Sequence, residues 1–405
     1  MAISLCLCLP VRAIDPARLH MKPFGHPAEL NSVLGPLRPK ETFRPQRSVI
    51  PIFQSDKLAA PQWIALGPDP IPNGQTYTSN GTAPPAKEVP VSGRVSAIAV
   101  DPTNPQIVYV GGAQGGVYRS MNGGKTWEQL LKGALNFAIG SITVDPTDST
   151  RVLVGTGEGN LSADSYFGVG VYLVTGAKST PTLNGPYSLT SAKGNAFANR
   201  SIVKILVDPN NNNIVFCATS SGVGGLGAQR GASLPPRGLY RSTNFTSANP
   251  TFDRLTVGPG ADVICTSAAM EPTNPDHVVC SLFGQVSSGG HNVQGGLYYS
   301  LNATSATPTF TLATVTGLTS DGNLPTLINV KLDISPDGKT VLAATDEYDT
   351  NQQDQGVLRQ STDGGKTYPT ILTAANGFAG GQGFYNIAIA IDQTNPQNVY
   401  LAGTL

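Results

Sequence analysis

The chain has 405 residues, and its 26 Lys and Arg balance its 26 Asp and Glu, so that the net charge is zero. Only 13% of the residues are charged, and without a basic stripe the composition gives no indication of a nucleic-acid partner. Beyond the N-terminus no apolar run approaches the ~20 residues of a membrane-spanning helix. The 46 Gly and 32 Pro separate many short apolar runs, which is typical of an all-β protein with many turns.

The N-terminal residues predict a signal peptide. The short apolar run Ile3–Leu9 is followed by Val11-Arg12-Ala13, which fits cleavage after Ala13. No Lys or Arg precedes the run, so the alternative is a start that clips a longer signal. We therefore expect residues 1–13 to be the signal peptide of a secreted or periplasmic protein. Residues 14–60 are Pro-rich and lack any apolar period, which indicates a pro-segment or linker.

From residue 61 onward a unit of four short strands recurs. Its first strand runs into a turn that contains Asp-Pro or a variant of it, as in "VSAIAVDPTNP" at Val95–Pro105. The turn returns after 44 residues, from Asp101 to Asp145, and after 63 more at Asp208. This spacing fits the blades of a β-propeller with inserted loops. The predicted domain covers residues 61–405, with blades near 91–130, 137–190, 200–256, 261–315 and 327–373 and the next one starting at 385.

Two copies of one octet predict the hairpin between the third and fourth strands of a blade. They read "SMNGGKTW" and "STDGGKTY". In each, an Asn or Asp can accept backbone hydrogen bonds, the glycines supply positive φ, Thr ties the far side of the turn and the aromatic residue packs against the blade. The structural residues are Ser120, Asn122, Gly124, Thr126 and Trp127, and Ser361, Asp363, Gly365, Thr367 and Tyr368. The blades at Ser242 and Ser300 carry diverged copies with longer turns.

This octet resembles the Asp-box, or BNR repeat, of the sialidase-like β-propeller superfamily. The resemblance covers roughly Trp63 to the C-terminus, and it implies an all-β propeller of four-stranded blades with Asp-box hairpins. That superfamily includes bacterial sialidases, xyloglucan-degrading hydrolases, sortilin-type receptors and a photosystem assembly factor, so fold alone does not settle function. No catalytic set of these families matches: Gln114, for example, stands where xyloglucan-active relatives place a catalytic Asp.

The predicted propeller is incomplete at its C-terminus. Five whole units are followed by a sixth that is cut after Leu405, just past its second strand. The segment Gln62–Pro68 predicts a lone fourth strand of the kind that closes a ring. We expect the chain to be the N-terminal part of a longer protein; the alternative is a smaller ring that closes with another chain.

The long loops between second and third strands hold the candidate catalytic carboxylates. Glu158 and Asp164 lie with Tyr166 in one loop, and Asp346, Glu347 and Asp349 lie in another. Two carboxylates on opposite sides of a ring could serve as the acid and base, or acid and nucleophile, of glycoside cleavage. The alternatives are that Glu158 caps amides of its own loop and that the second cluster is solvated or holds calcium. The calcium ligands would be Asp346, Asp349 and Asp354, although their spacing is not that of an EF-hand.

Candidate ligand-binding residues surround these loops. Arg94 and Arg200 begin innermost strands, where they could grip a carboxylate or phosphate or, as the favoured alternative, bond carbonyl groups at the channel mouth. The other candidates are Gln114, Asn160, Tyr166, His291 and Tyr385. We predict a bacterial-type secreted propeller that recognises, and as a glycoside-hydrolase-like enzyme could hydrolyse, a glycan or another extracellular polymer. It needs no cofactor, nucleic acid or membrane span. The alternative function is a non-catalytic scaffold that binds a protein.

Overall fold

The computed structural model describes residues 2–5, 71–74, 89–91, 93–160, 165–220, 234–258, 262–284, 295–316, 327–348, 354–375, 377–379 and 382–403. The chain divides into two compact units, one of residues 1–10 and 93–405 and the other of residues 11–92. In the second unit β2 (Ile71–Gly74) pairs antiparallel with β3 (Val89–Val91). The predicted closing strand at Gln62–Pro68 lies outside the described residues.

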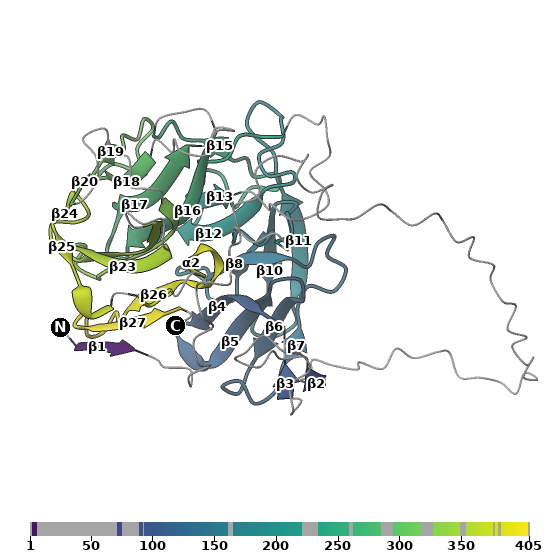
Figure 1. Ribbon diagram of the computed structural model, residues 1–405. Helices are drawn as coiled ribbons and strands as arrows, with labels where there is room; N and C mark the ends of the chain where they lie inside the picture. Colours follow the sequence, from purple (N-terminus) through teal and green to yellow (C-terminus); the bar gives the residue numbers. More distant parts are fainter. Residues whose placement is uncertain are drawn as a thin grey trace, which may run out of the picture. The chain divides into compact units, whose positions relative to one another are not determined.

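The larger unit consists almost wholly of β-strands (Figure 1), so the all-β propeller class predicted from the sequence is confirmed. Its first five sheets, blades 1 to 5, each have four antiparallel strands that follow one another in chain order. Blade 1 comprises β4 (Val95–Asp101), β5 (Asn104–Gly112), β6 (Gly116–Ser120) and β7 (Glu128–Gln129); blade 2 comprises β8 (Ile139–Val144), β9 (Val152–Thr156), β10 (Val171–Thr175) and β11 (Thr182–Tyr187). Blade 3 comprises β12 (Ser201–Val207), β13 (Val215–Ser220), β14 (Leu239–Ser242) and β15 (Asp253–Arg254); blade 4 comprises β16 (Val263–Glu271), β17 (Asn274–Gly284), β18 (Gly295–Ser300) and β19 (Thr311–Leu312); blade 5 comprises β21 (Leu327–Ile334), β22 (Val341–Tyr348), β23 (Asp354–Ser361) and β25 (Thr370–Ile371).

The sixth sheet, blade 6, contains β26 (Ala388–Ile391) and β27 (Asn398–Ala402), with β1 (Ala2–Leu5) parallel to the outer edge of β27. A small parallel pair, β20 (Thr314–Val315) with β24 (Thr367–Tyr368), links blade 4 to blade 5. The short helices η2 (Thr373–Ala375) and α2 (Gly383–Asn386) connect blade 5 to blade 6. In the described part of the chain, no helix has the length and apolar character that crossing a membrane requires.

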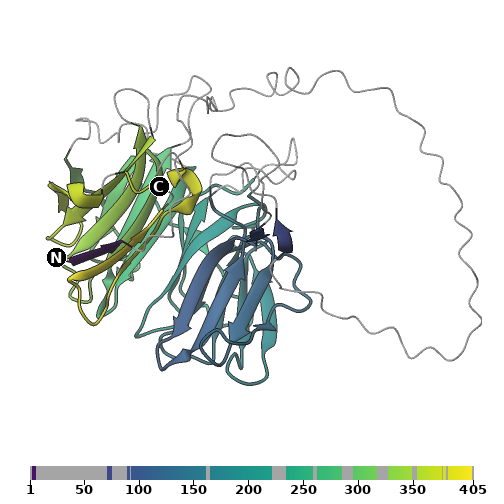
Figure 2. The ribbon, with the colours of Figure 1, turned by 60° about the horizontal axis from the view of Figure 1, so that its bottom comes forward.

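The blades are held together by apolar contacts between their faces. The first strands β4, β8, β12, β16 and β21 each lie against the first strand of the next blade, the last of these against β26 (Figure 2). Between blades 1 and 2, Tyr109 and Val117 pack against Ile142, Val154 and other residues in one buried cluster. Equivalent clusters fill each of the four following interfaces. The alternating pattern of each strand therefore supplies two apolar faces, one for each neighbouring blade.

Two kinds of connection gather at opposite ends of each blade. The hairpin between the third and fourth strands bonds the turn between the first and second, as in Gly123 N to Gln106 O and Gly364 N to Lys339 O. At the other end, the loop between the second and third strands bonds the chain entering or leaving the blade, as in Ala113 N to Arg94 O. We call these the hairpin end and the loop end.

The repeated octets form closely similar hairpins. In blade 1, Ser120 Oγ accepts from the Gly124 amide at 2.8 Å and Asn122 Oδ1 accepts from the Thr126 amide at 2.9 Å. In blade 5, Ser361 and Asp363 accept the equivalent bonds at 2.8 and 2.9 Å. The diverged hairpins keep the same asparagine, because Asn244 and Asn302 accept from Thr251 and Thr309 across the longer turns. The aromatic residues differ: Tyr368 is buried, whereas Trp127 is 40% exposed.

Among the described residues, the cysteines Cys217, Cys265 and Cys280 are buried free thiols. Cys280 lies directly opposite Ala268 in the pairing of β16 with β17. Burial raises the pKa of the Cys280 thiol well above its usual range, and the contact with Cys265 adds to this effect. Cys265 and Cys280 belong to the apolar contact between blades 3 and 4, and Cys217 to that between blades 2 and 3.

Candidate functional site

At the loop end of blades 1 and 2, an ion pair crosses from one blade to the next. Arg94 immediately precedes β4, and Glu158 follows β9; Arg94 Nη2 lies 2.7 Å from both carboxylate oxygens of Glu158. Asn160 donates to Glu158 Oε1 at 3.2 Å. The Glu158 side chain is completely buried, whereas 31% of the Arg94 side chain is exposed. The carboxylate is therefore shielded from solvent, whereas part of the Arg94 side chain is exposed.

The backbone around Glu158 is fixed by several hydrogen bonds. The Glu158 amide donates to Tyr166 O at 2.7 Å, and Ser201 Oγ from blade 3 donates to Glu158 O at 3.0 Å. Gly157 before it has φ +88°, and a Cβ atom there would lie 2.5 Å from the Gly168 amide nitrogen. Only glycine fits this conformation and this close approach. Glu158 is thus held firmly in place.

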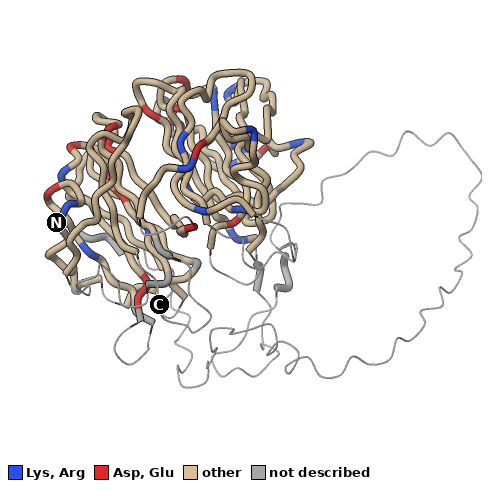
Figure 3. The backbone as a smooth tube through the Cα atoms, turned by 90° about the horizontal axis from the view of Figure 1, so that it is seen from above, with Lys and Arg blue, Asp and Glu red and all other residues tan. Residues whose placement is uncertain are grey.

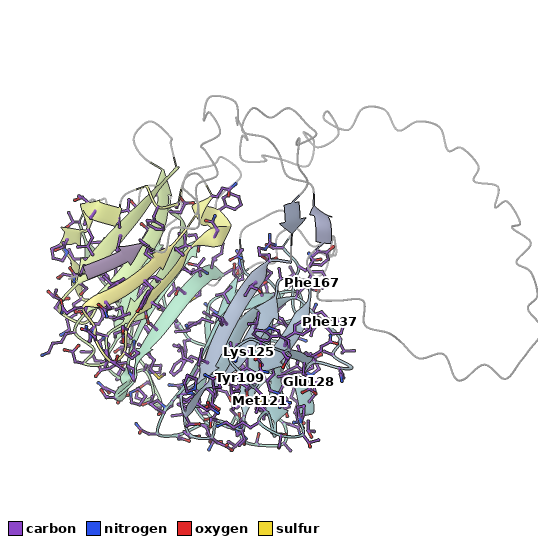
Figure 4. All side chains as sticks on the ribbon, turned by 90° about the horizontal axis from the view of Figure 1, so that it is seen from below. Tyr109, Met121, Lys125, Glu128, Phe137 and Phe167 are labelled. Atoms are coloured by element: carbon purple, nitrogen blue, oxygen red, sulfur yellow. The ribbon has the colours of Figure 1, made fainter. Side chains whose placement is uncertain are left out.

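Three aromatic residues lie in the loop-end segments of blades 1 and 2. Phe137 is 39% exposed and Tyr166 is 42% exposed, while Phe167 is partly exposed. Asn136 Nδ2 donates to Phe167 O at 2.9 Å and so ties the connection between blades 1 and 2 to the loop that carries Tyr166. Figure 4 shows Phe137 and Phe167 close together, toward the opposite end of the blade from Met121. We call Arg94, Asn160, Phe137, Tyr166 and Phe167 the aromatic surface of blades 1 and 2.

Arg200 points into the protein at the loop end of blade 3. It is 8% exposed, and its Nε donates to Pro235 O at 2.7 Å. Burial lowers the pKa of Arg200, and the nearby charge of Arg237 lowers it further. Arg237 in turn pairs with Asp262 through Nε and Nη2, both at 2.9 Å. Although burial opposes ionisation of Asp262, the hydrogen bonds from Arg237 outweigh it and hold the pKa of that carboxyl below its usual value.

Asp346 and Glu347, predicted in the blade 5 loop, instead lie in strand β22, paired with β23, and both are buried. Arg359 Nε and Nη2 each lie 3.0 Å from one oxygen of Glu347, and both side chains are almost completely buried. Asp346 is fully buried beneath α2, where a Cβ atom on Gly383 would lie 2.4 Å from Asp346 Cγ. Asn329, opposite Asp346 in the sheet, donates to Gly383 O at 3.0 Å. These carboxylates contact the protein itself rather than an open cleft.

The remaining predicted residues have varied positions. Asp164, His291 and Asp349 lie outside the described residues. Gln114 is exposed in the turn between β5 and β6, Tyr385 lies in α2, and Asp354 begins β23. Within the described ranges no three His, Cys, Asp or Glu side chains form a group able to hold a metal ion, so calcium binding stays a prediction.

Sequence reasoning did not identify Phe137, Phe167 or Arg359. An aromatic residue in the connection "GALNFAIG" between two blades was the available signal for Phe137. For Arg359, which lies 12 residues from Glu347 on the neighbouring strand, the sequence offered no local motif. A hollow of about 280 Å³ elsewhere, lined by Pro186, Tyr187 and Pro250 among others, carries no ionisable catalytic group.

Comparison with known proteins bears on the fold. No protein-family model matches the chain, and no curated protein sequence matches it. Among solved structures, the GH74 xyloglucanase from Xanthomonas campestris is 18% identical with a TM-score of 0.48; the match covers 76% of this chain and 44% of that one. An ancestral GH74 enzyme is 15% identical with a TM-score of 0.44, covering 69% and 32%. YCF48 from Cyanidioschyzon merolae is 13% identical with a TM-score of 0.40, covering 77% and 93%.

The chain thus spans less than half the length of the two GH74 proteins that it matches. At these identities the likeness concerns the fold alone. The propeller fold itself rests on the five four-stranded sheets and on the contacts between the first strands of successive blades.

Proposed function

We propose that the protein binds a glycan on the aromatic surface of blades 1 and 2. The observation that carries this proposal is the exposure of Phe137, Tyr166 and part of the Arg94 side chain at the loop end of blades 1 and 2. A sugar ring has an apolar face of C–H groups and a polar rim of hydroxyl groups. Aromatic rings offer a large, rigid apolar area to the C–H face of the sugar. Arg94, Asn160 and exposed Gln114 offer hydrogen-bond donors and acceptors to its hydroxyl groups.

The proposed activity is recognition rather than cleavage by the described carboxylates. A general acid must come within hydrogen-bond reach of the glycosidic oxygen. Glu158 is fully buried with Arg94 on both of its oxygens, and Glu347 is held by Arg359 in the same way. Neither carboxylate can meet a polymer without breaking an ion pair. This argues for binding as the function of the surface.

Binding is tested by calorimetry against a panel of soluble plant and bacterial polysaccharides. We expect Tyr166→Ala and Phe137→Ala to weaken binding of a retained polysaccharide at least ~10-fold each, which corresponds to about 1.4 kcal/mol. The matched control is Trp127→Ala, because Trp127 is a similarly exposed aromatic residue at the hairpin end. Loss of affinity in all three variants, or in none, would remove the aromatic surface from consideration. If no polysaccharide binds, the rival function of a protein-binding scaffold gains support.

We also propose that the protein is secreted, on the basis of the N-terminal apolar run and the cleavage pattern at Ala13. Cleavage there would remove β1 and leave the outer edge of β27 without its parallel partner. The intact mass of protein recovered from the medium of an expressing bacterium tests this. A mass that matches a chain beginning at Ile14 supports secretion. Full-length protein retained inside the cells contradicts it.

A further inference from the structure

We propose that Cys265 and Cys280 are a redox-active pair, whose two thiols an external disulfide converts into a bridge between the first and second strands of blade 4. The structure describes the reduced form of this pair, with both thiols free. Blade 4 lies within the series, with blades 3 and 5 on either side of it. The bridge requires neither glycan binding nor secretion.

The two cysteines lie on the same face of neighbouring strands. Cys265 is directly opposite Leu282 in the pairing of β16 with β17, and Cys280 precedes Leu282 by two residues. Because side chains alternate between the two faces of a strand, Cys280 shares a face with Leu282 and therefore with Cys265. All three belong to one apolar cluster, in which both cysteines are completely buried. The cysteines are thus diagonal neighbours within the contact between blades 3 and 4.

The strand pairing is irregular where the cysteines meet. In a regular ladder, diagonal neighbours lie about 7–8 Å apart, which is farther than the ~4.4–6.8 Å between the Cα atoms of a disulfide. The ladder shifts between Cys265 and Ser267. At this shift Thr266 Oγ1 lies 3.0 Å from Ser281 Oγ. The side chains of Cys265 and Cys280 interact directly through their thiols, so the reduced form already holds the reacting atoms side by side.

The bridge forms by thiol–disulfide exchange, for which oxidised glutathione is the probe. The thiolate of one cysteine attacks a sulfur of oxidised glutathione, so that a mixed disulfide forms and one glutathione leaves as its thiolate. The thiolate of the second cysteine then attacks the protein sulfur of the mixed disulfide, and the second glutathione leaves. The released glutathione thiolates take up the two protons that the cysteines lose. The cysteine pair is oxidised, and one glutathione disulfide is reduced to two thiols.

Burial decides when this exchange can take place. It raises the pKa of the Cys280 thiol well above its usual range, and the thiolate is the reactive form. Positive charge would favour the thiolate, but β16 and β17 contain no Lys or Arg. The described Lys and Arg are dispersed along the backbone (Figure 3); Lys331 contributes a single ammonium group, which donates to Thr266 O at 3.3 Å. We therefore expect fast exchange while the chain folds and slow exchange afterwards.

The position of Met270 between the two cysteines provides the test. Cyanogen bromide cleaves after Met270 and so separates residues 122–270 from residues 271–405. The full chain is refolded from urea in oxidised and reduced glutathione, its remaining thiols are blocked with N-ethylmaleimide, and the fragments are separated with and without reductant. The wild-type fragments should stay joined until they are reduced. Folded, reduced protein in the same buffer should acquire the bridge more slowly.

The control is Cys217→Ala, because Cys217 also lies in residues 122–270 but belongs to the contact between blades 2 and 3. Its fragments should stay joined as in wild type, and Cys217→Val repeats the control if Cys217→Ala does not refold. Cys265→Ala and Cys280→Ala should each leave the fragments separate. Separate fragments in the oxidised wild type would overturn the proposal, as would a bridge that is lost in both Cys217 variants.

A second measurement asks whether the bridge fits the folded blade. The oxidised chain should unfold at the same urea concentration as the reduced chain or at a higher one, followed by circular dichroism. A lower midpoint for the oxidised chain would overturn the proposal, because the bridge would then form only at the expense of the packing between blades 3 and 4.

Discussion

The buried pair of Arg359 with Glu347 gives the sharpest stability prediction. Both side chains are 3–4% exposed, and the two N–O distances are 3.0 Å. Arg359→Met leaves the Glu347 carboxylate buried with only the Thr345 hydroxyl, which donates to Glu347 Oε1 at 2.5 Å. Breaking a buried pair from one side costs about 3–5 kcal/mol, and the remaining hydroxyl recovers about 1 kcal/mol at most. We expect a loss of about 3 kcal/mol in the free energy of unfolding.

The double variant Glu347→Gln/Arg359→Met separates a lost charge pair from lost packing. It leaves no buried charge, so we expect it to be about 2 kcal/mol more stable than Arg359→Met alone. Equilibrium urea unfolding followed by circular dichroism measures all three proteins. If Arg359→Met unfolds within about 1 kcal/mol of wild type, or the double variant is as unstable as the single one, the pair does not stabilise blade 5 as the geometry indicates.

Three further predictions concern single positions. Gly383→Ala should lower the stability by about 1–3 kcal/mol in urea unfolding, because its Cβ would overlap Asp346, and Asp346→Ala in the same chain should restore most of the loss. Ser361→Ala should cost about 1–3 kcal/mol by the same measurement, because buried Ser361 accepts the Gly365 amide; no loss would mean that water replaces the hydroxyl. Burial, and then the charge of a nearby lysine, lower the pKa of Lys331 to about 8. Above about pH 8 the unfolded chain therefore binds more protons than the folded chain. The folded state gains stability as the pH rises through this range. The Lys331→Met variant lacks this gain. Its free energy of unfolding should exceed that of wild type by about 1–2 kcal/mol near pH 7, and this difference should shrink toward pH 10. A difference that does not change with pH would contradict the assignment.

The fold was predictable from the sequence because the same local turn and strand pattern recurs several times along the chain. Asp101, Asp145 and Asp208 each end a first strand in the same turn, and each accepts a bond from a backbone amide two residues later. The octet hairpins likewise depend on residues within seven positions of one another. Turns of this kind depend on residues that are close together in the sequence, so the sequence predicts them.

The site was less predictable, because it depends on contacts between residues far apart in the chain. Glu158 was correctly placed at the start of a long loop, but its partner Arg94 lies 64 residues away. No local pattern shows that the carboxylate turns inward. The exposure of Phe137 similarly depends on how the connection between two blades crosses the loop of the second. An aromatic residue next to apolar residues in the sequence is equally consistent with a buried core position.

Among the described residues, several loop-end arginines are engaged in ion pairs. With 13% charged residues, the chain uses its loop-end arginines to fix its own loops and blades. Arg94 ties blade 1 to blade 2, Arg237 binds Asp262 and Arg359 binds Glu347. An arginine engaged in a buried pair offers a ligand only the donors that remain. In the proposed glycan complex, selectivity should therefore come mainly from aromatic area and neutral polar groups. This is why truncating Tyr166 should affect binding more than neutralising any single carboxylate.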